Sequence, residues 1–323
     1  MNLQAIAKEA GVSVSTVSKA FSGSREISPE TRERIFAIAR KNGCFDRYNK
    51  NKFPKHIIAV LLPELVSEHY GAIGALLDRE ITAAGGVMVA STTDFNATRT
   101  RELFDYYASY ARADGIILVD PRGKVNNAGH TPAVAFTRVK QKNVDNVILD
   151  FYQAIEDCVR YLKEQGHTVI GFAGEQLTSA KQEHVCDAMR RLGLPIKQEH
   201  IKIAKTRFER AGEELAAAWL KEGKLPTAII TAYDHIAIGI IRYFRAHGVR
   251  VPEDVSVIGM DDIPVAPYFS TSLTSIHVYA EEACRTAVEL ILKKIKNQYY
   301  STREEIVFPA TFIARESSGK APR

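Results

Sequence analysis

Short apolar segments recur from residue 56 onward, separated by intervals that each hold a helix. Seven of them read HIIAVLL, GVMVAS, GIILV, AVAF, TVIGFA, TAIITA and VSVIG. Amphipathic stretches of helical length lie at 71–84, 98–112, 152–165, 209–221 and 235–247. Near-continuous apolar strands that alternate with helices are typical of parallel sheets covered on both faces, so an α/β doubly wound architecture is predicted. Roughly ten strands exceed one ordinary sheet, which predicts two similar subdomains.

Residues 1–45 show a different pattern, that of three short helices. Gly11 provides a left-handed turn after the first, Ser13 caps the second, and Ser28 with Pro29 begins the third. Apolar residues recur at helical spacing in all three: Leu3, Ile6, Ala7 and Ala10; Val14, Val17, Ala20 and Phe21; Ile35, Ile38 and Ala39. This arrangement predicts an all-α helix-turn-helix headpiece over 1–45. The alternative is a small helical subdomain with a capped surface helix.

The second helix keeps small polar side chains on its outer face. Val17, Ala20 and Phe21 can form the buried side, which leaves the outer side to Ser15, Thr16, Ser18 and Lys19. Small hydroxyls let a helix approach closely and can bond phosphates or base edges. The outer side is therefore predicted to be a recognition face for double-stranded DNA.

Charge is distributed unevenly along the chain. Residues 1–56 hold eleven Lys and Arg against five Asp and Glu, an excess of six positive charges, whereas the whole chain carries +5. The remainder is therefore slightly negative. This asymmetry indicates a polyanion-binding module attached to a near-neutral domain, with 46–56 as a basic linker.

Several other classes lack sequence support. No nucleotide-binding loop, HExxH or GxSxG motif occurs, which argues against an enzyme, and no cofactor or metal is predicted. The four cysteines are far apart and form no CxxC, so we expect them to be reduced and partly buried: Cys44, Cys158, Cys186 and Cys284. Neither an apolar leader nor a run long enough to span a membrane is present, which predicts a cytoplasmic location.

Polar residues follow the predicted strands directly. Ligands of open α/β sheets bind outside the carboxyl ends of the strands, so these residues are candidates for a cleft that binds a polar small molecule. Singly, each can instead be an ordinary loop or helix cap. The candidates from strand ends are Ser67, Tyr70, Asp94, Arg138, Asp150, Tyr233, Asp234 and Asp261.

The segment LQAIAKEAGVSVSTVSKAFSGSREISPETRERIFAIARKNG resembles the headpiece of the LacI/GalR family of bacterial transcription regulators. The similarity continues through ADGIILV, LKEQGH, PTAIITAYDHIAIGIIRYFRAHGVRVPEDVSVIGMDD and LTSI, in family order. It implies a periplasmic-binding-protein-like core at 57–316 in which the chain crosses three times between subdomains. We expect crossings near 138–142, 272–277 and 300–304. One subdomain then comprises 57–139 and 277–301, the other 140–275 and 302–316, and 317–323 forms a frayed tail.

The resemblance also assigns DNA contacts and a homodimer that reads two half-sites of a near-palindromic operator. By family position Val14, Ser15 and Lys19 face base edges, and Ser13, Thr16 and Ser18 hold phosphates. Ser22 and Arg25 complete the DNA-binding set. The linker departs from the family because it is short, contains Pro54 and has no Leu, which leaves Phe45 or Phe53 as the residue that could wedge into the minor groove.

The resemblance places Arg138 and Asp261 among the residues that contact sugar hydroxyls. Three positions depart from the family pattern: Lys181 replaces an arginine, Tyr233 replaces the usual asparagine, and Arg207 occupies the place of an aromatic unless a one-residue slip puts Phe208 there. Three cations in one cleft would suit an acidic sugar such as a uronate. Alternatively, Lys181 and Arg207 are rim residues in salt bridges.

Together these features predict a transcriptional regulator, a repressor controlled by a sugar or sugar-acid effector. One alternative is a regulator of the same architecture whose main effector is a protein partner. Another is a cytoplasmic solute-binding protein, which would share the core but have no headpiece.

Overall fold

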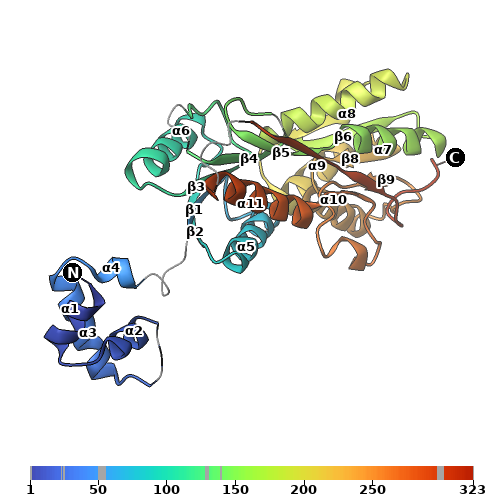
Figure 1. The fold of residues 1–323 in the computed structure, drawn as a ribbon. Helices are drawn as coiled ribbons and strands as arrows, with labels where there is room; N and C mark the ends of the chain where they lie inside the picture. Colours follow the sequence, from blue (N-terminus) through green and yellow to red (C-terminus); the bar gives the residue numbers. More distant parts are fainter. Residues whose placement is uncertain are drawn as a thin grey trace.

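The computed structural model describes residues 2–22, 24, 26–49, 56–127, 131–138, 140–296 and 302–322. The chain begins with four helices, followed by an α/β core in which two sheets lie one after the other (Figure 1). Within the described ranges, no helix is both long and apolar enough to cross a membrane.

Three helices and a single extra turn form the headpiece: α1 (Leu3–Ala10), α2 (Val14–Phe21), α3 (Pro29–Lys41) and α4 (Phe45–Tyr48). Gly11 has a φ of 67°, which allows the tight turn between α1 and α2. The side chains of Ser13 and Ser28 accept hydrogen bonds from the third backbone N–H of α2 and α3 respectively, which confirms the predicted caps.

The headpiece has a hydrophobic core of its own. Ile6, Val17, Ala20 and Ile35 are fully buried, in a cluster that shares no residue with the two clusters of the α/β core. The ring of Phe45 lies 5.1 Å from that of Phe36, edge to face, and belongs to this cluster. Phe45 is therefore unavailable as a minor-groove wedge, and Phe53 lies outside the described residues.

The first sheet is parallel and six-stranded, in the order β11-β5-β4-β3-β1-β2. Its two faces bury alternate residues, as in β1, where Ile58, Val60 and Leu62 face one cluster while Ala59 and Leu61 face the other. Helices α5 and α11 pack on the first face, and α6 with its π-helical continuation packs on the second. The elements of this first unit are β1 (Ile57–Leu62), α5 (Glu68–Ala83), β2 (Val87–Thr92), α6 (Ala97–Asp105, continued by Tyr106–Tyr110), β3 (Gly115–Val119), β4 (Ala133–Thr137), β5 (Asp145–Asp150), α11 (Ala280–Lys296) and β11 (Glu305–Pro309).

The second sheet is parallel and four-stranded, in the order β7-β6-β8-β9, and β10 pairs antiparallel with β12 beside it. Helices α9 and α10 pack together on one side, with α7 and α8 on the other (Figure 1). The elements of this second unit are α7 (Tyr152–Glu164), β6 (Ile170–Glu175), α8 (Ser179–Arg191), β7 (Ile201–Ala204), α9 (Phe208–Glu222), β8 (Ala228–Thr231), α10 (Asp234–Ala246), β9 (Ser256–Ile258), β10 (Ser275–His277) and β12 (Thr311–Ile313), with short 3-10 turns at Gln176–Thr178, Gln198–His200 and Ala266–Tyr268.

The chain crosses between the units at other positions than the sequence suggested. The first crossing follows β5, near residue 151, rather than 138–142, and the third follows β11, at residue 310, rather than 300–304. The second lies just beyond β10, at 278–279. Residues 145–150 and 305–309 had been assigned to the second subdomain, but β5 pairs with β4 and β11 with β5, so both strands extend the first sheet.

The C-terminal segment is docked rather than frayed, so the prediction of a loose tail is wrong for 317–321. Ser317 is fully buried, and its hydroxyl donates to the carbonyl of Val257 at 2.6 Å. The carbonyl of Gly319 lies 3.0 Å from Nε2 of His167, and the N–H of Ala321 donates to Gln165. These bonds fasten the end of the chain to the second sheet.

All four cysteines are buried and none forms a disulfide, as the sequence predicted. Burial raises the pKa of the Cys284 thiol to about 12, so this side chain stays protonated at neutral pH. The same cause raises the pKa of Cys158 well above its ordinary value. These side chains act as small apolar groups in the core.

Candidate DNA-recognition face and effector cavity

The outer face of α2 presents the residues that the sequence assigned to DNA. Val17, Ala20 and Phe21 are buried against α1 and α3, whereas Val14 is 42% exposed. The remaining predicted contact residues of α2 and its caps are exposed or partly exposed: Ser13, Ser15, Thr16, Ser18, Lys19 and Ser22. Arg25 lies outside the described residues.

Four of these side chains already have partners in the free protein: the hydroxyls of Ser13 and Thr16 lie 2.8 Å apart, and Lys19 and Ser22 have contacts of their own. The Lys19 ammonium lies 2.6 Å from a carboxylate oxygen of Glu26, and this contact lowers the pKa of Glu26. The hydroxyl of Ser22 donates to the carbonyl of Lys19 at 3.1 Å. A guanine or phosphate contact by Lys19 therefore requires this exposed ion pair to open.

Substitution Glu26→Gln is expected to strengthen binding to duplex DNA. The change frees Lys19 and removes a negative charge beside the phosphates, and because exposed ion pairs contribute little, the gain is at most about fivefold. Lys19→Ala is expected to weaken binding by about 1–3 kcal/mol and to relax preference at one operator position. Fluorescence anisotropy with labelled duplexes measures both.

Glu33→Gln is the matched control, because Glu33 is an exposed headpiece carboxylate that pairs with Arg40 on α3. An equal gain in this control would mean that only net charge matters and that Lys19 has no special position.

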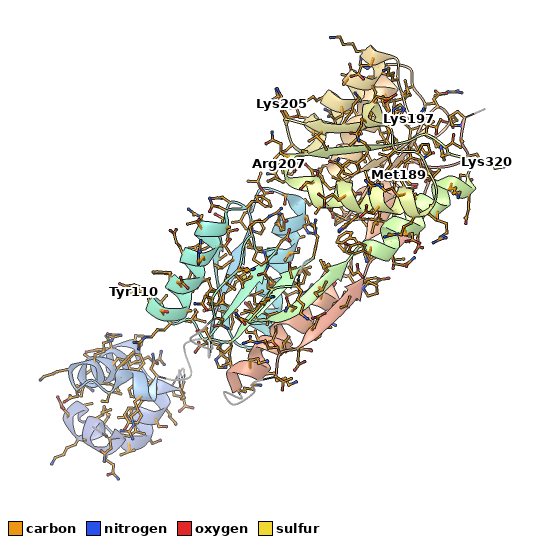
Figure 2. The ribbon with its side chains drawn as sticks, turned by 90° about the horizontal axis from the view of Figure 1, so that it is seen from above. Tyr110, Met189, Lys197, Lys205, Arg207 and Lys320 are labelled. Atoms are coloured by element: carbon orange, nitrogen blue, oxygen red, sulfur yellow. The ribbon has the colours of Figure 1, made fainter. Side chains whose placement is uncertain are left out.

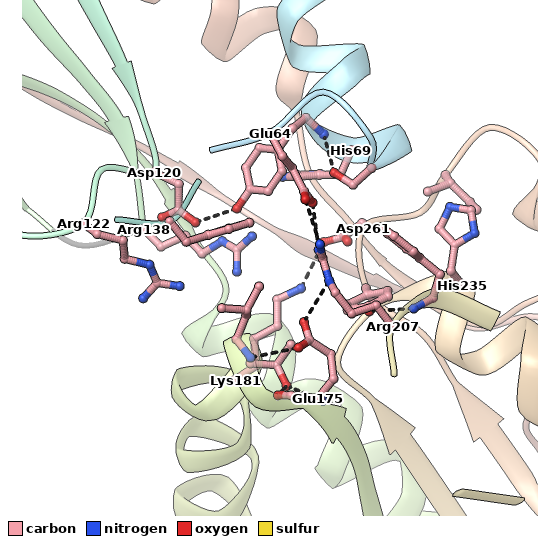
Figure 3. A pocket seen from close by; sticks show the side chains of 18 residues that line it. Glu64, His69, Asp120, Arg122, Arg138, Glu175, Lys181, Arg207, His235 and Asp261 are labelled. Atoms are coloured by element: carbon pink, nitrogen blue, oxygen red, sulfur yellow. Dashed lines mark hydrogen bonds and ion pairs between the residues drawn. The ribbon is translucent and has the colours of Figure 1, made fainter. Parts of the chain in front are cut away.

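A cavity lies between the two units of the core, at the carboxyl ends of both parallel sheets (Figure 3); its empty space, with the open solvent at its mouth, is about 590 Å³. This is the position that strand topology predicts for a ligand site. Its walls are formed by Glu64, Ser67, His69, Tyr70, Phe95, Asp120, Arg122 and Arg138 of the first unit and by Glu175, Leu177, Thr178, Lys181, Arg207, Phe208, Tyr233, His235, Asp261 and Ile263 of the second.

Lys181 forms a buried ion pair on the second-unit wall. Its ammonium lies 3.1 Å from Asp261 and donates to the carbonyl of Ala232 at 2.6 Å, and both charged side chains are 7% exposed. Burial lowers the pKa of Lys181. Burial alone would raise the pKa of Asp261, but the positive charges of Lys181 and its neighbours more than offset this and lower it.

Arg207 connects the two units across the cavity. Its guanidinium donates two hydrogen bonds to the Glu64 carboxylate, each of 2.7 Å, and its Nε lies 3.8 Å from Glu175. The guanidinium also lies over the rings of Phe95 and Phe208, at 5.7 and 4.7 Å. Figure 2 places Arg207 at the junction of the two units. Such a bidentate pair favours a closed arrangement of the cavity.

A second polar contact spans the same gap. His235 on α10 lies 3.1 Å from Glu68 at the start of α5 through Nε2, and 2.5 Å from Glu209 through Nδ1. Glu68 belongs to the first unit and Glu209 to the second, so His235 links the units beside the Arg207–Glu64 pair. Both contacts must break when the units separate.

The first-unit wall centres on Asp120. The hydroxyl of Tyr70 donates to Asp120 at 2.8 Å, and Arg138 and Arg122 lie close enough to attract the same carboxylate. Burial would raise the pKa of Asp120, but Arg138, the Tyr70 hydrogen bond and Arg122 together lower it. Burial and the Asp120 charge raise the pKa of Tyr70 well above its ordinary value.

Several cavity residues have left-handed backbone conformations that side chains other than glycine rarely adopt. The φ angles are 54° at Phe95, 42° at Asp120, 60° at Phe208 and 100° at Asp261. Strained backbone of this kind persists where the surrounding structure imposes it, and it clusters at ligand sites. Here it directs these side chains toward the cavity.

The family comparisons match both parts of the chain. The description "Bacterial regulatory proteins, lacI family" matches residues 2–43, and "Periplasmic binding protein-like domain" matches 159–318. The headpiece and core thus occur in the order and with the geometry described above. This chain belongs to the LacI family.

Named relatives and solved structures agree with this membership. Catabolite control protein A of Staphylococcus epidermidis is 24% identical over 95% of this chain and 94% of its own length, and the transcriptional repressor CytR of Escherichia coli K12 is 26% identical over 98% and 96%. The CelR–cellobiose complex has a TM-score of 0.69 at 23% identity, covering 98% of this chain and 99% of that one. A LacI family regulator from Lactobacillus casei with bound glucose reaches 0.71 at 22%, covering 81% and 99%. Like other LacI-family members, this chain is a DNA-binding transcriptional regulator.

Seven of the ten predicted effector residues line the cavity of this LacI-family core: Ser67, Tyr70, Arg138, Lys181, Arg207, Tyr233 and Asp261. The other three do not line it. Asp94 is an exposed residue that pairs with Arg99, and Asp150 accepts a hydrogen bond from the N–H of Tyr152 at the start of α7. Asp234 is fully buried and accepts hydrogen bonds from Ser275 and the N–H of Ile263. These three fit the alternative that a polar residue at a strand end is an ordinary loop or helix cap.

The sequence left open whether Arg207 or Phe208 occupies the position of the family's aromatic residue, and in the structure both residues line the cavity. Phe208 provides an aromatic wall, and its N–H donates to the Tyr233 hydroxyl at 3.1 Å. The two terminal nitrogens of Arg207 are paired with Glu64, as the salt-bridge alternative predicted, and its buried Nε forms no hydrogen bond with a described residue. The carboxylates beside Arg207 are those of Glu64 and Glu175.

Asp234 should make stability fall as pH rises. Burial, with the nearby charge of Asp261, raises its pKa to about 8. A folded-state pKa above the unfolded one contributes stability that is complete in acid and is lost as pH rises through the folded value. Relative to Asp234→Asn, the wild type should therefore lose about 1 kcal/mol per pH unit between about pH 4 and 8. Urea denaturation at several pH values measures this.

Asp254→Asn is the control for that series. Arg250 lowers the pKa of Asp254 to about 2, so this carboxyl is ionised in both states from about pH 5 to 8. Its substitution should give a difference from wild type that does not vary with pH. Parallel pH profiles for Asp234→Asn and wild type would contradict the assignment.

Sequence reasoning missed about half of the cavity wall. Glu64 and His69 follow a predicted strand and were visible as polar strand-end residues. Asp120 and Arg122 follow GIILV in the same way and gave the same signal. Glu175 and His235 follow the predicted strands TVIGFA and TAIITA and gave this signal as well. Phe95 gave none, because its place in the wall depends on left-handed backbone.

Proposed function

We propose that this chain is a repressor that binds a near-palindromic operator as a homodimer and is controlled by a small polar effector of the sugar or sugar-acid class. The observation that carries the proposal is the cavity between two units joined to a headpiece with an exposed recognition helix. Relatives named as transcriptional repressors support repression rather than activation.

The headpiece supplies DNA affinity. Its excess of positive charge and the exposed hydroxyls of α2 suit phosphates and base edges. Two headpieces related by a twofold axis would read two half-sites with a fixed spacing. The headpiece precedes β1, so the orientation of the two first units in a dimer would set that spacing.

The cavity couples the effector to that orientation. The Arg207–Glu64 and His235–Glu68 contacts both join the units, so the closed arrangement is favoured even without a ligand. An effector that touches both walls adds contacts that exist only when the cavity is closed. By linkage, it changes operator affinity to the extent that it prefers one arrangement.

The cavity chemistry supports a polyol. Hydroxyl-bearing and charged groups alternate with the rings of Tyr70, Phe95, Phe208 and Tyr233, which give apolar faces for a sugar ring. Solved relatives with bound glucose, sucrose, ribose or cellobiose carry ligands of this class.

A thermal-shift screen of the full chain against neutral sugars, sugar acids and sugar phosphates tests the proposal. A ligand at a hundred times its dissociation constant should add about 2.7 kcal/mol to the free energy of unfolding. Stabilisation by none of these classes, in a preparation that still binds DNA, would contradict a sugar-type effector.

A further inference from the structure

Four cationic side chains line the cavity, and they fall into two pairs. Lys181 and Arg207, on the second-unit wall, are bonded to carboxylates: Lys181 to Asp261 at 3.1 Å, and Arg207 to Glu64 through two bonds of 2.7 Å. Each therefore has a counter-charge in place. A ligand acid would have to displace a carboxylate to reach either of them.

Arg138 and Arg122, on the first-unit wall, are different. Neither guanidinium forms a hydrogen bond or an ion pair with any residue that the structure describes, and Figure 3 shows both on the side of the cavity that holds Asp120. Arg138 lies 5.3 Å over the Phe151 ring, and Arg122 lies 5.9 Å over the Phe95 ring. Each guanidinium thus lies near an aromatic ring, while its donors have no partner among the described residues.

The charges on this wall do not balance. Asp120 is the carboxylate that attracts both arginines, and one of its oxygens already accepts the hydrogen bond from Tyr70. Two guanidiniums thus share this carboxylate, and Arg138 is also attracted by Asp261, which Lys181 already neutralises on the opposite wall. The opposite wall and its partner Glu64 provide three carboxylates, Glu64, Glu175 and Asp261, for Lys181 and Arg207. The cavity is therefore positive at the Arg138–Arg122 wall and negative across from it.

We propose that the effector carries an anionic oxygen group, a carboxylate or a phosphate, which Arg138 and Arg122 bind. This inference rests on the proposed function and specifies its ligand: a sugar acid or sugar phosphate whose charged end meets the first-unit wall. Arg207 and Lys181 do not bind that group but hold the closed cavity around it. With a neutral sugar, Arg138 would keep only Asp120 and Asp261 as counter-charges, neither of them within ion-pair distance, whereas an anionic group could pair with the guanidinium directly.

Calorimetric titration of the full chain with glucose, glucuronate and glucose 6-phosphate tests this assignment. At least one of the two anions is expected to bind about tenfold or more tightly than glucose, and which one does so distinguishes a carboxylate site from a phosphate site. Arg122→Gln is expected to lower the affinity for that anion about tenfold and to leave glucose binding within about twofold. Arg122 is exposed, so the variant should fold.

Arg99→Gln is the matched control, because Arg99 is an exposed first-unit arginine that pairs with Asp94 outside the cavity. It should change none of the three affinities. Equal binding of glucose and both anions, or an equal loss for all three probes in Arg122→Gln, would overturn the anionic site while leaving a sugar effector in place. Failure of all three probes to bind would contradict the proposed sugar class together with this inference.

Discussion

Deletion of residues 1–56 is expected to abolish operator binding while leaving a folded core. The headpiece cluster around Ile6, Val17 and Ile35 shares no residue with the clusters of the core, so its loss exposes little core surface. The core without it is slightly negative and has no charge excess to hold a polyanion. Because specific binding exceeds non-specific binding by at least about a thousandfold, the loss should be of that order.

Anisotropy with operator and with unrelated duplex measures this loss, and circular dichroism checks the fold of the fragment. The same fragment should still respond to the effector in a thermal-shift assay. Salt-dependent DNA binding by the fragment would contradict the division of roles between headpiece and core.

Substitution Gly239→Ala is expected to be among the most destabilising single changes in the core. Helices α9 and α10 touch here through their backbones: a Cβ at Gly239 would lie 2.0 Å from the Glu209 carbonyl oxygen, and one at Gly212 would lie 2.2 Å from that of Ile236. Backbone atoms cannot rotate away, so the helices must separate. The expected cost is about 3 kcal/mol, the upper part of the range for overpacked cores, which corresponds to a fall in Tm of about 10 °C.

Gly71→Ala provides the control, because a Cβ on Gly71 in α5 meets only the Leu65 carbonyl oxygen at an ordinary 3.8 Å. Alanine favours a helix over glycine, so this variant should match or exceed the wild-type Tm. Differential scanning calorimetry of the three proteins gives the comparison. A Gly239→Ala protein with unchanged Tm would show that α9 and α10 are not in close backbone contact.

The local elements of the fold could be predicted from sequence, but the long-range pairing could not. Apolar runs and caps such as Ser13 and Ser28 predicted strand and helix positions that the structure confirms. The predicted positions of the crossings were wrong because the sequences of β5 and β11 do not resemble buried strands. β5 begins with the polar residues Asp145 and Asn146, and β11 is half exposed. Only their pairing, across more than 150 residues of sequence, shows which sheet they join.

For the candidate site, too, local features could be predicted from the sequence and long-range contacts could not. Strand ends correctly indicated Ser67, Arg138 and Asp261, because parallel strands bring their carboxyl ends together. They could not show that Glu64 is the partner of Arg207, since 143 residues separate the two and the contact exists only across the closed cavity. The strand-end pattern also could not distinguish a structural aspartate such as Asp234 from one that contacts a ligand, because both kinds of aspartate occur at strand ends.

Coupling between the cavity and the headpiece is tested by operator affinity at saturating effector. The effector found by thermal shift is titrated into full-length protein with labelled operator, and calorimetry confirms that the cavity is saturated. Operator affinity should change by about 5-fold to 150-fold, and operator should change effector affinity by the same factor. A fall in operator affinity would identify the effector as an inducer, and a rise would identify it as a corepressor. Operator affinity that stays constant with the cavity fully occupied would contradict the account.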